Sequence, residues 1–516
     1  MKKINYLLVS IVLVATNSIL GQKNLLYENL PVGKYAVGFK IITLTDDSRV
    51  IKPEYNYLGE KNEGDLTRKI TIHLWYPAIP NTGNRTIKYN EYCYNHLITA
   101  NDEVLPEDQK KIQWENNKSS LERWFGKLPG EEAWNSLLQT NMLAKSGADH
   151  VKEKLPLLIG MLRPMSTTMT NELLASNGYV IAMIVQGNFS IGAFSQIALN
   201  DVPSLQQVIA FLKKDGHIDE HKIGTFGFSG SGFIQVLLAM HDVRIKALAD
   251  MESAIFGIKE YMVSNYYNPM KLKIPFMHIY SKELAGRDTH FEEFYKMKFS
   301  KRYHVILNQP EWQHWNVATE GYTSCVALHI RGKEEMNIQK SFEVANIYLL
   351  NFFNAELKSY EQAKTFLSVK PVIPKIPSTL WDIDILNPVQ APPNKDDFEN
   401  IIRSKGIQEA ITVIGKTLSN DSTSELYQGF ILNRMGYTFL NEQKMEAAIG
   451  IFKLNTELHP EDANWFDSLA EAYEVSGNTP MTKQISQFIL DMLNKKSELN
   501  EAEKSLKETA LKRLEG

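Results

Sequence analysis

The chain has 516 residues and a mass of 58.9 kDa, a length that predicts two or three domains at roughly 100–200 residues each. Hydrophobic residues make up 43% and charged residues 22%, which excludes a disordered or a fibrous protein. The formal net charge is −4, so no basic field exists to recruit nucleic acid. The only two cysteines, Cys93 and Cys325, exclude a disulfide scaffold and a zinc site built from several thiolates; the sequence leaves open whether they pair.

Residues 1–21 have the layout of a signal peptide. Lys2 and Lys3 precede a short apolar run, small or polar residues follow it, and cleavage is expected near Gly21. The apolar run is shorter than the ~20 residues that a membrane span needs. We therefore expect an exported protein, periplasmic or extracellular, with no transmembrane segment in the mature chain.

Residues 22–370 alternate between short apolar runs and helical patterns, with helices expected over 201–214 and 232–241. Short continuous apolar runs separated by helices are typical of a parallel sheet covered on both faces. The sequence therefore predicts an α/β domain with a mostly parallel sheet. The expected strands are 70–76, 155–160, 179–185, 223–228, 243–250, 274–280 and 303–307.

Residues 94–152 show no clear strand pattern and contain Trp114, Trp124 and Trp134 among charged helical stretches. An insertion before the strand expected at 155–160 would lie near the mouth of a site at the sheet edge. We interpret it as a lid or a substrate-contact segment, and a solvated helical decoration is the alternative.

The most informative segment is 221–240, in which a strand runs into the pentapeptide G-F-S-G-S at 227–231 and a helix follows at once. Strand, sharp turn and helix are the setting of a nucleophile elbow, which needs small residues beside the serine. The N–H of Gly230 would point to a developing oxyanion at a helix N-terminus. Ser229 is therefore the predicted nucleophile. Ser231, in place of the usual glycine, is the competing nucleophile, and a turn that binds a phosphate or nothing is the inert alternative.

A serine nucleophile needs a base, and the base needs an orienting acid. In this arrangement the chain order is serine, acid, histidine. His314 follows the strand expected at 303–307 and would lie in a loop at the carboxyl edge of the sheet, so it is the predicted base. Four other histidines are interpreted as packed or solvated: His278, His290, His304 and His329.

Asp250 ends the strand expected at 243–250 and is the leading prediction for the orienting acid. Glu252 lies two residues further on. Glu283 and Asp288 follow the next strand, which is the other common position of the acid in this fold. Each of these carboxylates also fits a solvated loop position, so the choice stays open at this point.

Several short motifs follow one another along residues 31–355. They are GKYAVG at 33–38, HLWYP at 73–77, LASNGYV at 174–180, ID at 218–219 leading into KI at 222–223, the elbow, and H-x-N at 314–316. In this order they resemble the secreted type of platelet-activating factor acetylhydrolase and its bacterial α/β-hydrolase relatives. The resemblance implies an α/β-hydrolase fold and ester hydrolysis without metal or cofactor. It places the nucleophile, acid and base on Ser229, Asp250 and His314.

The chain departs from these relatives where they carry a His-Gly-x-Gly loop that supplies the second oxyanion N–H. Here residues 160–166 read GMLRPMS, and Pro164 has no N–H to donate. The second donor is therefore expected at Met165, with Arg163 as the alternative. The loss of one such donor typically lowers kcat by about 10²–10³.

The C-terminal part has a different composition. Six prolines within 371–393 predict an extended linker over 371–395, followed by a helical domain over 396–516. One set of residues has the spacing of a 34-residue helix–turn–helix repeat and resembles tetratricopeptide repeats: Leu432, Gly436, Phe439, Ala448, Phe452 and Pro460. A second, degraded copy has Phe466, Ala470, Tyr473 and Gly477, with Thr482 and Ser486 at two expected small or aromatic positions.

These patterns together predict an exported serine esterase acting on a small-molecule or lipid ester. The helical repeats would bind a protein partner, or they would form a cap on their own enzyme domain. The alternative is a hydrolase-fold binding protein with little or no activity. The missing His-Gly loop favours this alternative, and the intact Ser–Asp–His order speaks against it.

Overall fold

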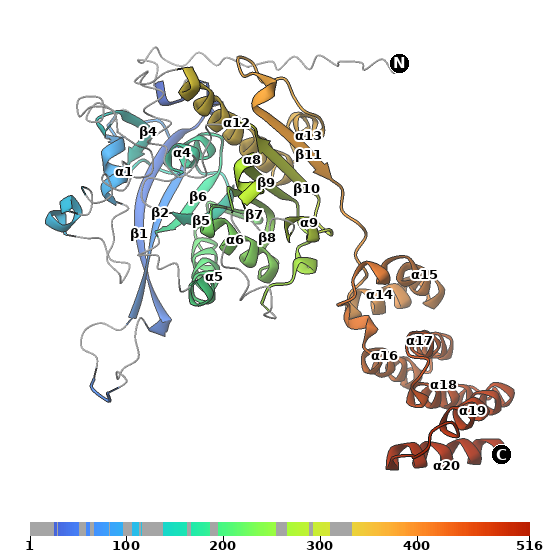
Figure 1. Cartoon of the computed structure of the whole chain (residues 1–516). Helices are drawn as coiled ribbons and strands as arrows, with labels where there is room; N and C mark the ends of the chain where they lie inside the picture. The colour runs from blue at the N-terminus through green and yellow to red at the C-terminus, as the bar shows by residue number, and fades with distance from the viewer. Residues whose placement is uncertain are drawn as a thin grey trace, which may run out of the picture. The chain divides into compact units, whose positions relative to one another are not determined.

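The computed structural model describes the residues 25–27, 29–50, 58–61, 67–81, 83–95, 106–112, 115, 138–162, 167–185, 194–253, 266–287, 293–309 and 333–516 (Figure 1). The chain divides into two compact units, Met1–Pro388 and Val389–Gly516. The expected signal peptide, the three tryptophans of the insertion and Cys325 lie outside the described residues, so the structure does not test them.

The first unit is built on one sheet in which the described strands have the order β11-β10-β9-β8-β7-β5-β6-β2-β1-β4-β3. Pairing is parallel from β6 through β5, β7, β8 and β9 to β10, and antiparallel where β2 joins β6 and β11 joins β10. This confirms the mostly parallel α/β fold. The strands are β1 (Ala36–Val50), β2 (Thr67–Ala78), β3 (Thr86–Lys88), β4 (Asn141–Ser146), β5 (Leu155–Leu162), β6 (Val180–Val185), β7 (Ile218–Phe228), β8 (Ile245–Met251), β9 (Phe276–Ser281), β10 (Arg302–Leu307) and β11 (Trp381–Leu386).

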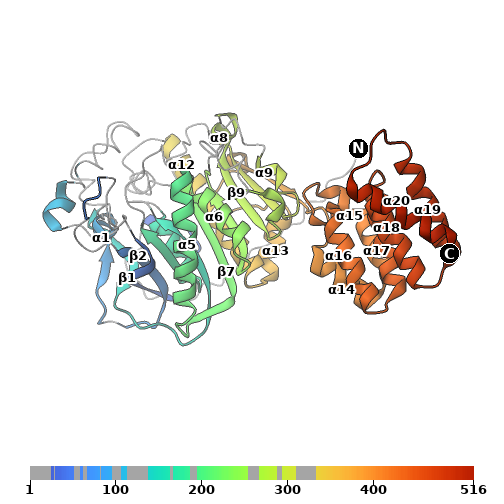
Figure 2. The same ribbon diagram turned by 90° about the horizontal axis from the view of Figure 1, so that it is seen from below.

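Helices cover both faces of the sheet (Figures 1 and 2). One apolar core lies under α4 (Thr168–Ser176), α12 (Lys333–Glu356) and α13 (Glu361–Ser368). The other lies under α5 (Phe194–Leu212), α6 (Gly230–His241) and the short α9 (Glu293–Lys296). The central strands are buried on both sides, which explains why they read as continuous apolar runs in the sequence.

The prediction of a linker from residue 371 is corrected by the last strand of the sheet. β11 pairs with β10 over its whole length, from Arg302 opposite Leu386 to Leu307 opposite Trp381. Trp381 is fully buried, and its indole N–H donates to the Tyr348 hydroxyl on α12 at 3.0 Å. The prolines flank this strand, and an edge strand tolerates them there.

The expected insertion is also narrower than the sequence suggested. Its C-terminal part, β4, pairs in parallel with β1, and its N-terminal boundary falls in α1 (Tyr89–Asn95). Residues 141–146 therefore belong to the sheet. Cys93 lies in α1, and its side chain is outside the described part.

The second unit consists of helices, as the sequence predicts from residue 396 onward. α14 packs on α15, and each helix from α16 to α19 packs on the next; α15, α16 and α18 also contact the helix two further along (Figure 2). The helices are α14 (Lys395–Lys405), α15 (Ile407–Thr417), α16 (Gly429–Asn441), α17 (Met445–Leu458), α18 (Ala463–Val475), α19 (Thr479–Leu493) and α20 (Glu501–Glu515).

Two glycines show why the repeat spacing works. A Cβ atom on Gly436 in α16 would lie 2.4 Å from the ring of Phe452 in α17, so only glycine permits this close approach of the two helices. Gly477 follows α18 with φ +76°, a left-handed conformation that ends the helix before α19 begins. Both positions were expected from the 34-residue spacing.

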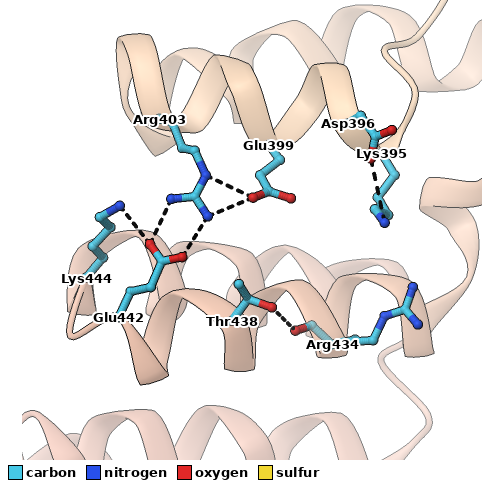
Figure 3. Close-up of polar contacts among 8 residues, drawn as sticks. All are labelled: Lys395, Asp396, Glu399, Arg403, Arg434, Thr438, Glu442 and Lys444. Atoms are coloured by element: carbon cyan, nitrogen blue, oxygen red, sulfur yellow. Dashed lines mark hydrogen bonds and ion pairs between the residues drawn. The ribbon is translucent and has the colours of Figure 1, made fainter.

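Polar contacts also join α14 to the end of α16 (Figure 3). Both guanidinium amino groups of Arg403 donate to the carboxylate of Glu442, at 2.7 and 2.8 Å, and Nε donates to Glu399 at 2.9 Å. Lys444 also binds Glu442 at 2.7 Å. These cations lower the pKa of Glu442 to about 2, although all four side chains are solvent-accessible. The Arg403 guanidinium also lies 4.6 Å from the ring centroid of Phe439.

Candidate active site

The sheet topology alone marks one place for a site. From β5 the chain crosses to β6 on one side and then returns to β7 on the other side. In open α/β sheets, ligands bind outside the carboxyl ends of the strands at such a reversal. Here α4 follows β5 on one face of the sheet and α6 follows β7 on the other.

Ser229 lies at this position, between the end of β7 and the start of α6. Its backbone has φ 53° and ψ −133°, a conformation that residues other than glycine rarely adopt. Its N–H donates to the carbonyl of Met251 on β8 at 3.0 Å, and its own carbonyl accepts from the N–H of Gly232 at 2.9 Å. The structure therefore shows the strained strand–turn–helix geometry that the sequence predicted.

Two glycines make this turn possible. A Cβ atom on Gly227 would lie 2.8 Å from the backbone of Gly232. A Cβ atom on Gly232 would lie 2.9 Å from the Ser253 hydroxyl and 3.1 Å from the Cβ of Asp250. Ser253 in turn donates to the carbonyl of Ser229 at 3.2 Å. The first turn of α6 is thus pressed against the ends of β7 and β8.

Ser231, the competing nucleophile, holds the turn together. It is buried, its hydroxyl donates to the carbonyl of Phe228 at 2.6 Å, and it accepts from the N–H of the same residue at 3.1 Å. This explains why a serine can take the fifth position of the motif. Its oxygen is engaged inside the elbow, which leaves Ser229 as the better candidate for a nucleophile.

Asp250, the leading prediction for the acid, lies below the edge of the sheet. It pairs with Gly227 in the register of β7 and β8, one residue before the strand ends, and it is fully buried. Within the described part of the chain, neither of its carboxylate oxygens has a hydrogen-bond donor. Burial, and then the nearby charge of Glu252, raise the pKa of Asp250 well above its usual value. Both effects favour the neutral form of the carboxyl group.

Asp250 belongs instead to a buried row across the sheet. It pairs with His278 on β9, which pairs with His304 on β10. Its Oδ1 lies 3.4 Å from Nε2 of His278, and both histidines are fully buried. Burial, and to a smaller extent the neighbouring His304, lower the pKa of His278. Burial and the charge of Arg302 lower the pKa of His304 to about 4. Both therefore favour the neutral form, as packed histidines do.

Glu252, the second candidate for the acid, lies beside Ser229 at the edge of the sheet. Phe228 pairs with Met251, so Ser229 and Glu252 are the next residues of two neighbouring strands at the same edge. Glu252 has φ 51°, and its N–H donates to the carbonyl of Ile279 at 2.7 Å. Its carboxylate accepts a hydrogen bond from the Ser281 hydroxyl at 3.0 Å. The sequence signal that points to Glu252 is its place directly after the strand β8, just as Ser229 stands directly after β7.

The other predicted residues have different outcomes. Gly230 is the first residue of α6, where backbone amides have no intrahelical acceptor, as its oxyanion role requires. Glu283 is exposed in the first turn of α8 (Lys282–Arg287). The remaining site residues lie outside the described residues: Arg163, Met165, Asp288, His290, His314 and His329.

The described residues contain no group of three or more histidine, cysteine, aspartate or glutamate side chains that could hold a metal ion. Among the same residues, no helix has the length and apolar character required to cross a membrane.

Residues 88–331 match the family model of the X-Pro dipeptidyl-peptidases, the S15 family. Among solved structures, a ferulic acid esterase from Streptomyces cinnamoneus aligns with a TM-score of 0.44 and 16% identity, over 69% of this chain and 97% of that chain. No curated protein matches the sequence. The α/β fold, the elbow and the family match together support a serine hydrolase of the α/β-hydrolase type.

Proposed function

We propose that the protein is a serine hydrolase that cleaves carboxylic esters through an acyl-enzyme. The observation that carries this proposal is the backbone of Ser229, which adopts a strained conformation at a helix N-terminus beside the reversal of the sheet. Strain of this kind persists only where the surrounding structure enforces it, and it concentrates at functional sites. Gly227 and Gly232, which admit no side chain, provide that enforcement here.

In the proposed reaction the Ser229 hydroxyl attacks the ester carbonyl and gives its proton to His314. The tetrahedral oxyanion accepts hydrogen bonds from the N–H of Gly230 and from the 163–166 segment, with Met165 as the proposed donor. Collapse expels the alcohol, which takes the proton from His314. Water then attacks the acyl-enzyme with His314 again as base, and the acid and free Ser229 are formed.

For the orienting acid we assign Glu252 rather than Asp250. An acid in this role must be ionised and must lie at the edge where the base can reach it. Glu252 meets the positional requirement and has a hydroxyl donor on its carboxylate, whereas Asp250 is buried two residues below with its pKa raised.

Two substrate classes follow from the supporting observations. The resemblance to platelet-activating factor acetylhydrolases favours a short acyl ester of a lipid or another small molecule. The S15 match favours cleavage after a proline in a peptide. A panel of p-nitrophenyl acyl esters and X-Pro p-nitroanilides would distinguish them, because an ester hydrolase turns over the first group and leaves the second unchanged.

The test of the nucleophile is labelling of the full chain with a fluorophosphonate probe, with the adduct located by mass spectrometry. We expect one adduct on Ser229 that disappears in Ser229→Ala. Ser231→Ala is the matched control and should still be labelled, since its hydroxyl is engaged with Phe228. Folded protein that resists labelling would contradict the proposal and favour a hydrolase-fold binding protein.

For the rest of the chain we propose export through the N-terminal segment and a tetratricopeptide-like role for the helical unit in binding a protein partner. The close approach at Gly436 and the turn at Gly477 support the repeat assignment. Mass spectrometry of the mature N-terminus tests the first proposal, and cleavage near Gly21 is the expected result.

A further inference from the structure

Ser281 connects the proposed acid to the end of the neighbouring strand. It is the last residue of β9, and its hydroxyl donates to Oε2 of Glu252 at 3.0 Å. The N–H of Leu284 in α8 donates to the same hydroxyl oxygen at 3.1 Å. Ser281 and Glu252 are both buried. A single hydroxyl therefore accepts from a helix amide and donates to the carboxylate.

This pattern fixes the direction of the hydroxyl proton. A serine hydroxyl has one proton and two lone pairs. The amide of Leu284 can only donate, so it must point to a lone pair. The carboxylate of Glu252 can only accept when ionised, so it takes the proton. The first turn of α8 thus orients the hydroxyl toward Glu252 before any substrate binds.

Glu252 is consequently held at two points by the same strand. Its backbone N–H donates to Ile279, and its side chain accepts from Ser281, two residues further along β9. A glutamate side chain has one more rotatable bond than aspartate and needs such a second contact to stay in one orientation.

We propose that Ser281 is a positioning residue of the catalytic machinery, which acts through Glu252, the acid of the proposed function. This inference rests on the proposed function and assigns a role to a residue beyond the triad and the oxyanion donors. Its contribution comes from a hydrogen bond to a charged group, which is stronger than one between neutral groups.

The test compares three substitutions at Ser281 in the full chain, with steady-state kinetics on the best ester of the panel. Ser281→Ala removes both bonds. Ser281→Asp keeps an acceptor for the Leu284 amide and replaces the donated proton by a second carboxylate that repels Glu252. Ser281→Thr keeps both. We expect kcat to fall about tenfold in the Ala variant with KM unchanged, at least as much in the Asp variant, and little in the Thr variant.

The pH profile separates this role from a purely structural one. Without the hydrogen bond from Ser281, the full negative charge of Glu252 stabilises the protonated imidazole of the base. The pKa of the base then rises, so the acidic limb of the kcat/KM profile should move to higher pH. A loss of folded enzyme would lower the activity at every pH and leave the limb in place. If the Ala variant does not fold, the Asp variant, which retains the helix cap, carries the same comparison.

Unchanged kcat and an unchanged acidic limb in the Ala and Asp variants would overturn the inference and leave Ser281 as the cap of α8. That result is distinguishable from failure of the proposed function. In the latter case the wild-type chain itself would not react with the fluorophosphonate probe.

Discussion

At the scale of single residues, the elbow and the acid differ in how far they follow from the sequence. Ser229 is predicted by its glycine neighbours and by the strand before it, because few other turns need small residues at these positions. Asp250 and Glu252 cannot be separated in this way. They are two residues apart, and the register between β7 and β8, which decides between them, becomes known only in the structure.

The assignment of the acid predicts opposite outcomes for two isosteric changes. Glu252→Gln should lower kcat by about 10³–10⁴, because the amide can no longer stabilise the imidazolium. Asp250→Asn should keep kcat within a few-fold of the wild type, since this residue lies among buried histidines below the edge. Ester hydrolysis by both variants, normalised to folded protein by circular dichroism, provides the comparison. The reverse pattern would return the role to Asp250.

The buried histidines predict acid sensitivity of the fold. Folding lowers the pKa of His304 from 6.5 to about 4. Between pH 6.5 and pH 4 the unfolded chain therefore binds a proton at this histidine, and the folded chain does not. Stability therefore falls as the pH drops below 6.5. This residue alone accounts for about 2 kcal/mol at pH 5.

His304→Phe should reduce the loss of stability between pH 7.5 and pH 5 by this amount. Urea midpoints at the two pH values measure it. The exposed His221, changed to Gln, is the control and should leave the difference as it is in the wild type. An identical pH dependence in both variants would mean that folding does not lower the pKa of His304.

At the scale of elements, the central strands and the helices beside them follow from the apolar runs, because their burial on both faces leaves a strong signal. Four strands at the margins of the sheet were not expected: β1, β3, β4 and β11. β1 and β11 alternate between exposed and partly buried residues over much of their length, and β3 and β4 are short and only partly buried. Their pairing depends on partners far away in the chain, and periodicity within a short window does not reveal that.

The helical unit permits a matched pair of glycine substitutions. Gly436→Ala places a Cβ atom 2.4 Å from the Phe452 ring, so α16 and α17 must move apart, and we expect a loss of about 1–3 kcal/mol. Gly415→Ala in α15 has no atom within 4 Å of the new methyl group. It should stabilise the helix by about 0.5–1 kcal/mol. Thermal melting of both full-length variants tests this contrast, and equal effects would contradict it.

At the scale of the whole molecule, the boundary between the two units decides where the chain can be divided. A chain that ends after Pro388 keeps β11 and the buried Trp381 and should retain both its melting temperature and its ester hydrolysis. A chain that ends after Lys370 loses the edge strand and exposes Tyr348. We expect it to be destabilised by at least about 3 kcal/mol, the usual cost of losing a buried tryptophan.

Thermal melting and esterase assays on the two truncated chains test this boundary. Equal stability of both would show that the sheet does not need β11. A loss of hydrolysis after truncation at Pro388, with melting unchanged, would instead assign the helical unit a part in catalysis.

The place of β11 has a consequence for the order in which the protein is made. The strand that closes the edge beside β10 is the last of the sheet to leave the ribosome, after every catalytic residue and immediately before the helical unit. Until then β10 presents an unpaired edge, which is a template for pairing with other chains. A chain that begins to fold before residues 381–386 are available therefore exposes this edge and is prone to aggregate.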